Sequence, residues 1–78
     1  MTKITLKHLR YFDALARNRH FGRAAEAPAI SQPALSLQIR ELEEILGAAL
    51  VERGARQIRL TALGEAFFLR AREVLRAV

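Results

Sequence analysis

Cysteine is absent from this sequence of 78 residues. Without a thiol the chain cannot form a disulfide, a thiolate metal site or a redox switch of its own, and it has no cysteine nucleophile. Glycine and proline are scarce, with four and two copies, so each of them marks a candidate end of an element. These absences leave a chain built from short regular elements, without thiol chemistry.

Long apolar runs are missing as well. No segment approaches the roughly 20 apolar residues of a membrane span, and the start, MTKITLKHLRYF, lacks the apolar core of a signal peptide. We therefore expect a cytoplasmic protein that makes no contact with membranes. The length fits a single domain, without internal repeats or low-complexity tracts.

Acidic residues are outnumbered, since 8 Asp and Glu stand against 13 Lys and Arg and the net charge is +5. Such an excess fits a polyanionic partner such as nucleic acid. Charge alone leaves the question open, because many small basic domains bind no anion.

No spacing and no glycine-rich loop brings the candidate acids, bases and nucleophiles together; these are His8, Asp13, His20, Ser31 and Ser36. Two separated histidines without cysteine or a carboxylate cluster also make a poor metal site, so we expect both to be surface or capping residues. We predict a protein that is not an enzyme and that holds no metal and no cofactor.

The first predicted helix begins after Thr5, which can cap it. One of its faces carries apolar residues at spacings of three and four and is predicted to lie in the core: Leu6, Leu9, Phe12 and Ala16. Tyr11 and Leu15 form a second apolar ridge, which a small monomer has little reason to expose. We therefore predict that this second ridge contacts a partner chain.

A short helix over residues 22–27 is predicted to end at Pro28, because proline lacks the N–H and collides with the preceding turn. Ser31 can then cap a longer helix over residues 31–46. Gly47 supplies the C-terminal stop of this longer helix.

Two short β-prone runs, 50–53 and 57–60, flank a turn at 54–56 and predict a β-hairpin. Thr61 can cap a last helix, and nothing breaks that helix before the chain ends. Its apolar stripe comprises Leu63, Phe67, Ala71, Val74 and Val78, with Phe68 and Leu75 to one side. Since the sequence stops within a helix, we expect a fragment of a longer protein.

The helix over residues 31–46 has two different faces. At about 100° per residue, the inner face comprises Leu35, Ile39, Leu42 and Leu46 and is predicted to be buried. The opposite face begins with Pro33, Ala34, Ser36, Leu37 and Arg40 and then becomes acidic with Glu41 and Glu44. Because acidic groups repel phosphate, only the first half of this helix can approach DNA.

This pattern matches a helix-turn-helix, in which the start of the second helix enters the major groove. Serine and glutamine can read base edges or phosphates there, Leu37 can meet a thymine methyl group, and the helix N-terminus favours phosphate. The alternative is a solvated helix start whose serine and glutamine only cap the helix. The short alanine-rich helix, the tight turn, the capped helix and the basic hairpin together favour DNA binding.

The segment HFGRAAEAPAISQPALSLQIRELEEILGAALVERGARQIRLTALGEAF resembles the N-terminal winged helix-turn-helix domain of LysR-type transcriptional regulators. The resemblance is carried by the linked motifs AA, ISQPALS, QIRELE, LG, ER and RLTALGE, and it extends back to LKHLRYFDALARNRHF. It implies a mainly α fold: a winged helix-turn-helix of three helices and a two-stranded β-hairpin wing over residues 1–60, then a long linker and dimerisation helix over 61–78. In that family, helices two and three form the reading motif and the hairpin lies against the DNA backbone.

The resemblance also implies roles for single residues. Ser31, Gln32, Pro33, Ala34 and Ser36 resemble the family's groove-facing positions, and Arg53 in the motif ER resembles its phosphate-contacting wing arginine. The predicted DNA-binding set also includes Arg23, Leu37, Arg40 and, from its charge and its place in the hairpin turn, Arg56. The predicted dimer contacts are Tyr11, Leu15, Phe68 and Leu75.

Two positions depart from the family pattern. Leu37 stands where many members carry arginine, so a bidentate guanine contact is absent and the preferred half-site should differ, by about 1–3 kcal/mol at one base pair. Pro28 replaces a position that is usually apolar and helical, which removes a core side chain and shortens the second helix.

We therefore predict a DNA-binding domain that reads double-stranded DNA, at an operator with an imperfect inverted repeat, as a homodimer; a tetramer is an alternative for the full-length protein. The resemblance implies an effector-binding domain, outside this chain, that senses a small molecule or a redox signal. Two other classes of function stay open: an architectural DNA binder indifferent to sequence, and a protein-interaction module whose basic residues only aid solubility. Salt dependence separates the last from the others, since binding through phosphates weakens steeply with salt.

Overall fold

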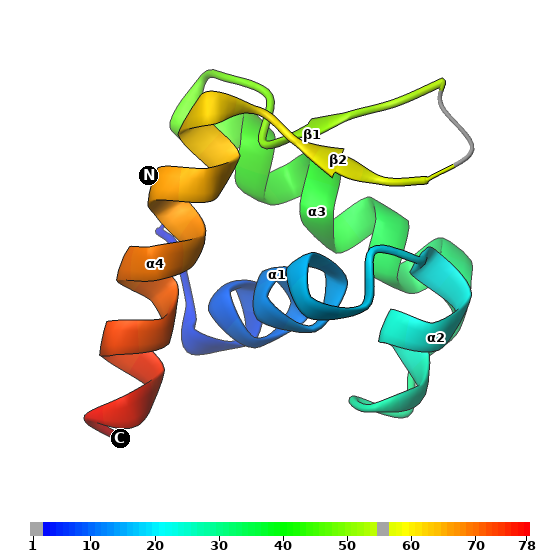
Figure 1. Ribbon diagram of the computed structural model, residues 1–78. Helices are drawn as coiled ribbons and strands as arrows, with labels where there is room; N and C mark the ends of the chain where they lie inside the picture. Colours follow the sequence, from blue (N-terminus) through cyan, green and yellow to red (C-terminus); the bar gives the residue numbers. More distant parts are fainter. Residues whose placement is uncertain (1–2, 55–56) are drawn as a thin grey trace.

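The order of elements in the chain follows the sequence prediction. The computed structural model describes residues 3–54 and 57–78 (Figure 1). In this part of the chain the elements are α1 (Leu6–Asn18), α2 (Phe21–Glu26), α3 (Gln32–Leu46), β1 (Val51–Glu52), β2 (Arg59–Leu60) and α4 (Ala62–Arg76). The predicted fold class, a mainly α winged helix-turn-helix with a further helix after the wing, is confirmed.

Side chains cap the N-termini of all four of these helices. In each case the capping atom accepts a hydrogen bond from the backbone N–H three residues later, at 3.0–3.2 Å; the pairs are Thr5 with His8, His20 with Arg23, Ser31 with Ala34 and Thr61 with Gly64. Each cap satisfies a donor that the helix leaves unpaired and is worth about 1 kcal/mol. The predicted starts of the first, third and fourth helices are therefore confirmed.

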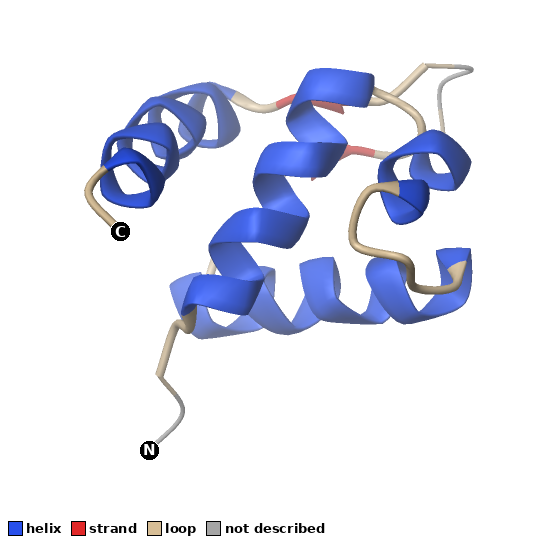
Figure 2. Ribbon diagram, turned by 90° about the horizontal axis from the view of Figure 1, so that it is seen from below, coloured by secondary structure: helices blue, strands red, loops and turns tan. Residues whose placement is uncertain are grey.

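Helix α1 is the central element, because it contacts α2, α3 and α4 (Figures 1 and 2). The largest side chains with no exposed surface form one core between these helices and the hairpin: Phe12, Leu15, Leu35, Ile39, Leu42 and Leu50. The ring of Phe12 meets that of Phe67 on α4 edge to face, with centroids 5.6 Å apart. This core packs both α3 and α4 against α1.

The prediction that Leu15 contacts a partner chain is wrong. Its side chain has no exposed surface and lies in the core, and Tyr11 is half-buried against the same core. The physical reason is that α1 has neighbours on three sides, so both of its apolar ridges face this protein. By contrast Leu6, which was predicted to be in the core, is 39% exposed.

The apolar residues of α4 are also distributed differently from the prediction. Phe67, Phe68 and Leu75 are half-buried, the first two against the core, and Gly64 and Ala71 are buried. Gly64 lets α4 approach the base of the wing, because a Cβ at that position would meet the backbone of Leu50. The large apolar side chains left exposed in this segment are Leu63 at 43%, Leu69 at 63%, Val74 at 46% and Val78 at 72%.

His8 was expected to be a surface or a capping residue. It caps α1, but it does not lie on the surface. Only 3% of it is exposed. Its Nδ1 accepts a hydrogen bond from the backbone N–H of Thr5 at 3.0 Å, and its Nε2 lies 2.8 Å from Oε1 of Glu41 on α3. The neutral tautomer with its proton on Nε2 satisfies both contacts. His8 therefore ties the start of α1 to α3.

The hairpin is shorter than predicted. Its strands pair antiparallel, with Val51 opposite Leu60 and Glu52 opposite Arg59. Leu50 continues the contact beyond the strands, because its carbonyl oxygen accepts a hydrogen bond from the N–H of Thr61 at 3.0 Å. Helix α4 therefore begins directly at the base of the wing.

Candidate nucleic-acid interface

Helices α2 and α3 form a helix-turn-helix. Helix α2 ends at Glu26, before Pro28 as predicted, and Ala29 turns the chain with a left-handed φ of 57°. The N–H of Ile30 closes the turn on the carbonyl oxygen of Ala25 at 3.0 Å. Ala24 is fully buried, so α2 packs in the core despite the proline at its end.

Three fully buried residues fix which side of α3 faces the solvent: Leu35, Ile39 and Leu42. The burial predicted for these three is confirmed, while Leu46 is half-buried. On the other side, Gln32, Pro33, Leu37 and Arg40 are exposed, and Ala34 and Ser36 are half-buried. Leu37 is 65% exposed.

Ser31 takes part in the structure of the helix start. Its Oγ accepts a hydrogen bond from the N–H of Ala34 at 3.1 Å, and its side chain remains on the surface. Ser31 therefore does cap the helix, which was the alternative to DNA contact that the sequence left open. Capping does not exclude a contact with DNA, because a hydroxyl that accepts one hydrogen bond still has a proton to donate.

Glu43 connects the second half of α3 to the wing. Its Oε2 accepts hydrogen bonds from the N–H groups of Leu50 at 2.8 Å and Val51 at 3.3 Å, and its Oε1 forms an ion pair with Nη1 of Arg53 at 3.0 Å. The side chain of Glu43 is 12% exposed and that of Arg53 is 35% exposed. Arg53 is therefore held beside α3.

No role was predicted for Glu43 from the sequence. The sequence feature that could have indicated a role is the angular position of Glu43 on the helix. At about 100° per residue, it falls beside Ser36 and away from Glu41 and Glu44. Its partners, however, lie in the hairpin that follows, and no local pattern in the sequence indicates which side of α3 that hairpin covers.

Arg40 and Arg53 border the same surface depression, of about 430 Å³, where the end of α3 meets the wing. Gly47, Ala48 and Ala49 also line it, together with Glu43 and Glu44. Two guanidinium groups are thus gathered at the edge of the exposed side of α3. Arg23 is exposed on α2 but does not line this depression, and Arg56 lies outside the described residues.

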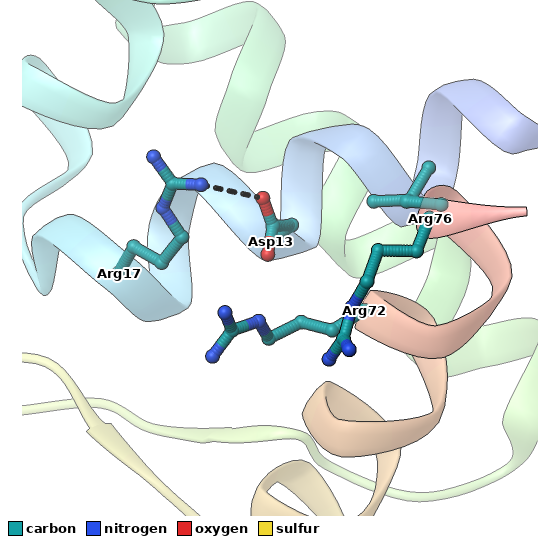
Figure 3. Close-up of a pocket in the computed structure, with 5 residues that line it drawn as sticks. Asp13, Arg17, Arg72 and Arg76 are labelled. Carbon is teal, nitrogen blue, oxygen red and sulfur yellow. Dashed lines mark ion pairs between the residues drawn. The ribbon is translucent and has the colours of Figure 1, made fainter. Parts of the chain in front are cut away.

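A second basic surface lies between α1 and α4, away from the helix-turn-helix. It is a pocket of about 260 Å³ lined by Asp13, Arg17, Arg72, Leu75 and Arg76 (Figure 3). The carboxylate of Asp13 is 3.5 Å from Nη1 of Arg17, and the guanidinium of Arg72 lies over the ring of Phe68, 5.7 Å from its centroid.

Residues 3–54 and 57–78 contain no group of three or more histidine, aspartate or glutamate side chains placed to hold a metal ion. Over the same residues, no helix is both long enough and apolar enough to cross a membrane.

Comparison with known proteins places this arrangement among bacterial regulators. The model of the bacterial regulatory helix-turn-helix proteins of the lysR family matches residues 6–65. The regulator BudR of Klebsiella aerogenes is 54% identical over 70 residues, which cover 90% of this chain and 49% of BudR. YnfL of Escherichia coli K12, an uncharacterized regulator of the helix-turn-helix type, is 51% identical over 75 residues, which cover 96% of this chain and 25% of YnfL. The chain thus spans about half the length of the first relative and a quarter of the second.

Solved structures show the same fold. The BenM DBD in complex with benA site 1 DNA superposes with a TM-score of 0.92 and is 43% identical, over 95% of this chain and 83% of that chain. The CbnR DBD in complex with DNA has a TM-score of 0.90 and 39% identity, over 95% of this chain and 85% of that chain. A full-length OxyR variant from Pseudomonas aeruginosa has a TM-score of 0.92 and 44% identity, over 96% of this chain and 25% of that chain.

Proposed function

Since this chain belongs to the lysR family of bacterial regulatory helix-turn-helix proteins, we propose that it is the sequence-specific DNA-binding domain of a transcription regulator, with α3 in the major groove. The observation that carries this proposal is the exposed, uncharged start of α3, together with two arginines farther along, where α3 meets the wing. The family consists of regulators and not of enzymes, in agreement with the prediction from the sequence.

The base contacts are assigned to the first half of α3. Gln32 is exposed there and Ser36 is half-buried, and both can donate to and accept from base edges. The side chain of Leu37 offers an apolar surface that suits the methyl group of thymine. Pro33 and Ala34 let the DNA backbone and bases approach closely, because their side chains are short.

The phosphate contacts are assigned to arginines around this surface. Arg53 and Arg40 flank the exposed side of α3 at the wing, and Arg23 extends the basic surface onto α2. Arg56 belongs to the same proposed set from its charge and its position in the hairpin loop. These charges position the protein on any DNA, whereas α3 distinguishes sequences.

We assign the dimer contact to the exposed apolar side of α4. The helical period places Leu63 and Val74 on one side of α4, and both are more than two-fifths exposed. A second copy packed there by a two-fold axis would place two α3 helices in successive major grooves of an imperfect inverted repeat. This face replaces the contact predicted through Leu15, which is in the core.

The experiment that tests the function is selection of bound sequences from a random duplex pool by this chain at moderate salt. We expect enrichment of a two-fold symmetric site with half-sites about one helical turn, or a multiple of it, apart. Binding without enrichment would support an architectural DNA binder, and a folded chain that binds no DNA would support a protein-interaction module.

Alanine substitutions should separate base contacts from phosphate contacts. Gln32→Ala and Ser36→Ala should weaken binding to the selected site more than binding to random DNA. Arg53→Ala should weaken both about equally and reduce the slope of log affinity against log salt by about one unit. Fluorescence anisotropy titrations at several salt concentrations measure both quantities. Equal effects of the three substitutions on both DNAs would contradict the assignment.

A charge placed on the α4 face should break the dimer. We expect Val74→Glu to weaken self-association roughly tenfold or more, because an unpaired carboxylate would be buried in the contact. Leu69→Glu is the matched control, since Leu69 is also exposed but lies on another side of α4. Analytical ultracentrifugation gives the dissociation constants. If Leu69→Glu disrupted the dimer and Val74→Glu did not, the assigned face would be incorrect.

A further inference from the structure

Glu43 divides its two carboxylate oxygens between different tasks. Oε2 accepts the N–H groups of Leu50 and Val51, at 2.8 and 3.3 Å, and so fixes the backbone at the start of the wing. Within the described part of the chain, Oε1 accepts only from the guanidinium of Arg53, at 3.0 Å. The contacts of Oε2 stabilise the backbone of the wing. The contact of Oε1 fixes the position of a single side chain, that of Arg53.

Arg53 keeps most of its donors available in this pair. A guanidinium carries five N–H donors in a planar fork, and only Nη1 contacts Glu43. The side chain is 35% exposed, so the remaining N–H groups can reach a phosphate. An unpaired arginine at the same place would lose the freedom of its long side chain on binding, which weakens the contact.

We propose that Glu43 is a positioning residue for DNA binding: it holds the guanidinium of Arg53 at a fixed distance from α3, so that the wing and the recognition helix contact DNA as one rigid unit. This inference rests on the proposed function. It assigns to a residue of α3 a role in the phosphate contact of the wing, through Arg53 and without contact between Glu43 and DNA.

Simple electrostatics makes the opposite prediction. A negative charge near the DNA surface repels phosphate, so removal of the carboxylate of Glu43 should strengthen binding if charge alone mattered. Positioning predicts weaker binding. The sign of the change therefore distinguishes the two effects.

The test variant is Glu43→Gln, which keeps a carbonyl oxygen for the N–H groups of Leu50 and Val51 but turns an amide NH₂ toward Arg53. Glu44→Gln is the matched control, because Glu44 is the neighbouring residue, is exposed, and makes no side-chain ion pair within the described part of the chain. Both variants remove one negative charge from the same end of α3. Thermal unfolding monitored by circular dichroism checks that each variant is folded.

Binding to the selected site is measured by fluorescence anisotropy at several salt concentrations. We expect Glu43→Gln to weaken binding about three- to tenfold while Glu44→Gln leaves it equal or tighter. We also expect the double variant Glu43→Gln with Arg53→Ala to bind no more weakly than Arg53→Ala alone, since both substitutions remove the same contact. Tighter binding by Glu43→Gln, or additive losses in the double variant, would overturn the proposal.

A measurement on the free protein separates this proposal from the proposed function. The NMR signal of the Arg53 Nε–H group should show restricted motion in the wild-type protein and fast motion in Glu43→Gln. A mobile Arg53 side chain in the wild type would overturn the positioning role, whatever the DNA result. If the Arg53 side chain is ordered but the protein binds no DNA, the proposed function is refuted. The proposed role of Glu43 in DNA binding is then refuted as well.

Discussion

Replacement of Leu35 by alanine should lower the free energy of unfolding by about 2–5 kcal/mol. Leu35 has no exposed surface and is the first core residue of α3. Its removal leaves a cavity between α3 and its neighbours, and close-packed cores collapse only partly around such a cavity. Because Leu35 lies between Ala34 and Ser36, the substitution should also disturb the positions of these two residues, which are assigned to the major groove.

Leu37→Ala is the control for this prediction. It removes the same atoms from the same helix, but Leu37 is 65% exposed. Its effect on stability should therefore stay within about 0.5 kcal/mol, while the preference for one base pair of the half-site should change. Urea unfolding followed by circular dichroism measures the stabilities, at several protein concentrations because a dimer raises the apparent value. Equal losses from both variants would mean that the inner face of α3 is misassigned.

Gly64→Ala should also destabilise the protein, by about 1–3 kcal/mol or more. Helix propensity alone predicts a gain of about 1 kcal/mol from this change. Tertiary contacts turn this expected gain in stability into a loss, because an added Cβ would lie 2.0 Å from the carbonyl oxygen of Leu50 and 3.3 Å from Cβ of Leu60. The oxygen belongs to the backbone at the base of the wing, so α4 or the hairpin has to move.

Gly47→Ala separates this clash from the general cost of replacing a glycine. Gly47 ends α3 with a φ of 73°, and a Cβ there would meet no atom within 4 Å. Its replacement should cost about 1–2 kcal/mol from backbone strain alone, without displacing the wing. Gly64→Ala should in addition change the symmetric site that the protein selects, because in the proposed dimer the angle of α4 sets the spacing of the two α3 helices. A Gly64→Ala protein as stable as wild type would show that α4 does not pack this closely on the hairpin.

Helix starts and stops were predictable because their signals are local. Ser31 and Thr61 cap α3 and α4, and Gly47 ends α3 in the left-handed conformation that favours glycine. In each case the hydrogen bond spans at most four residues. A short stretch of sequence therefore contains the whole interaction.

The surfaces of α1 and α4 were less predictable. Periodicity identified apolar ridges, but it does not say how many neighbours a helix has. Helix α1 has three, so Leu15 and Phe12 on its two ridges are both fully buried. On α4, two members of the predicted stripe, Leu63 and Val74, are exposed, because the helix packs through small residues and the half-buried aromatic residues beside them.

The sequence by itself determined the family, the order of the elements and the buried side of α3, because these depend on residue type and on spacings of a few positions. The tertiary structure alone decided that Glu43 holds Arg53, that His8 contacts Glu41 and that α4 leaves Leu63 and Val74 exposed. These contacts join residues on different elements, or depend on which face of a helix a neighbour covers. Their geometry follows from how the helices pack around α1, and no local spacing in the chain encodes that packing.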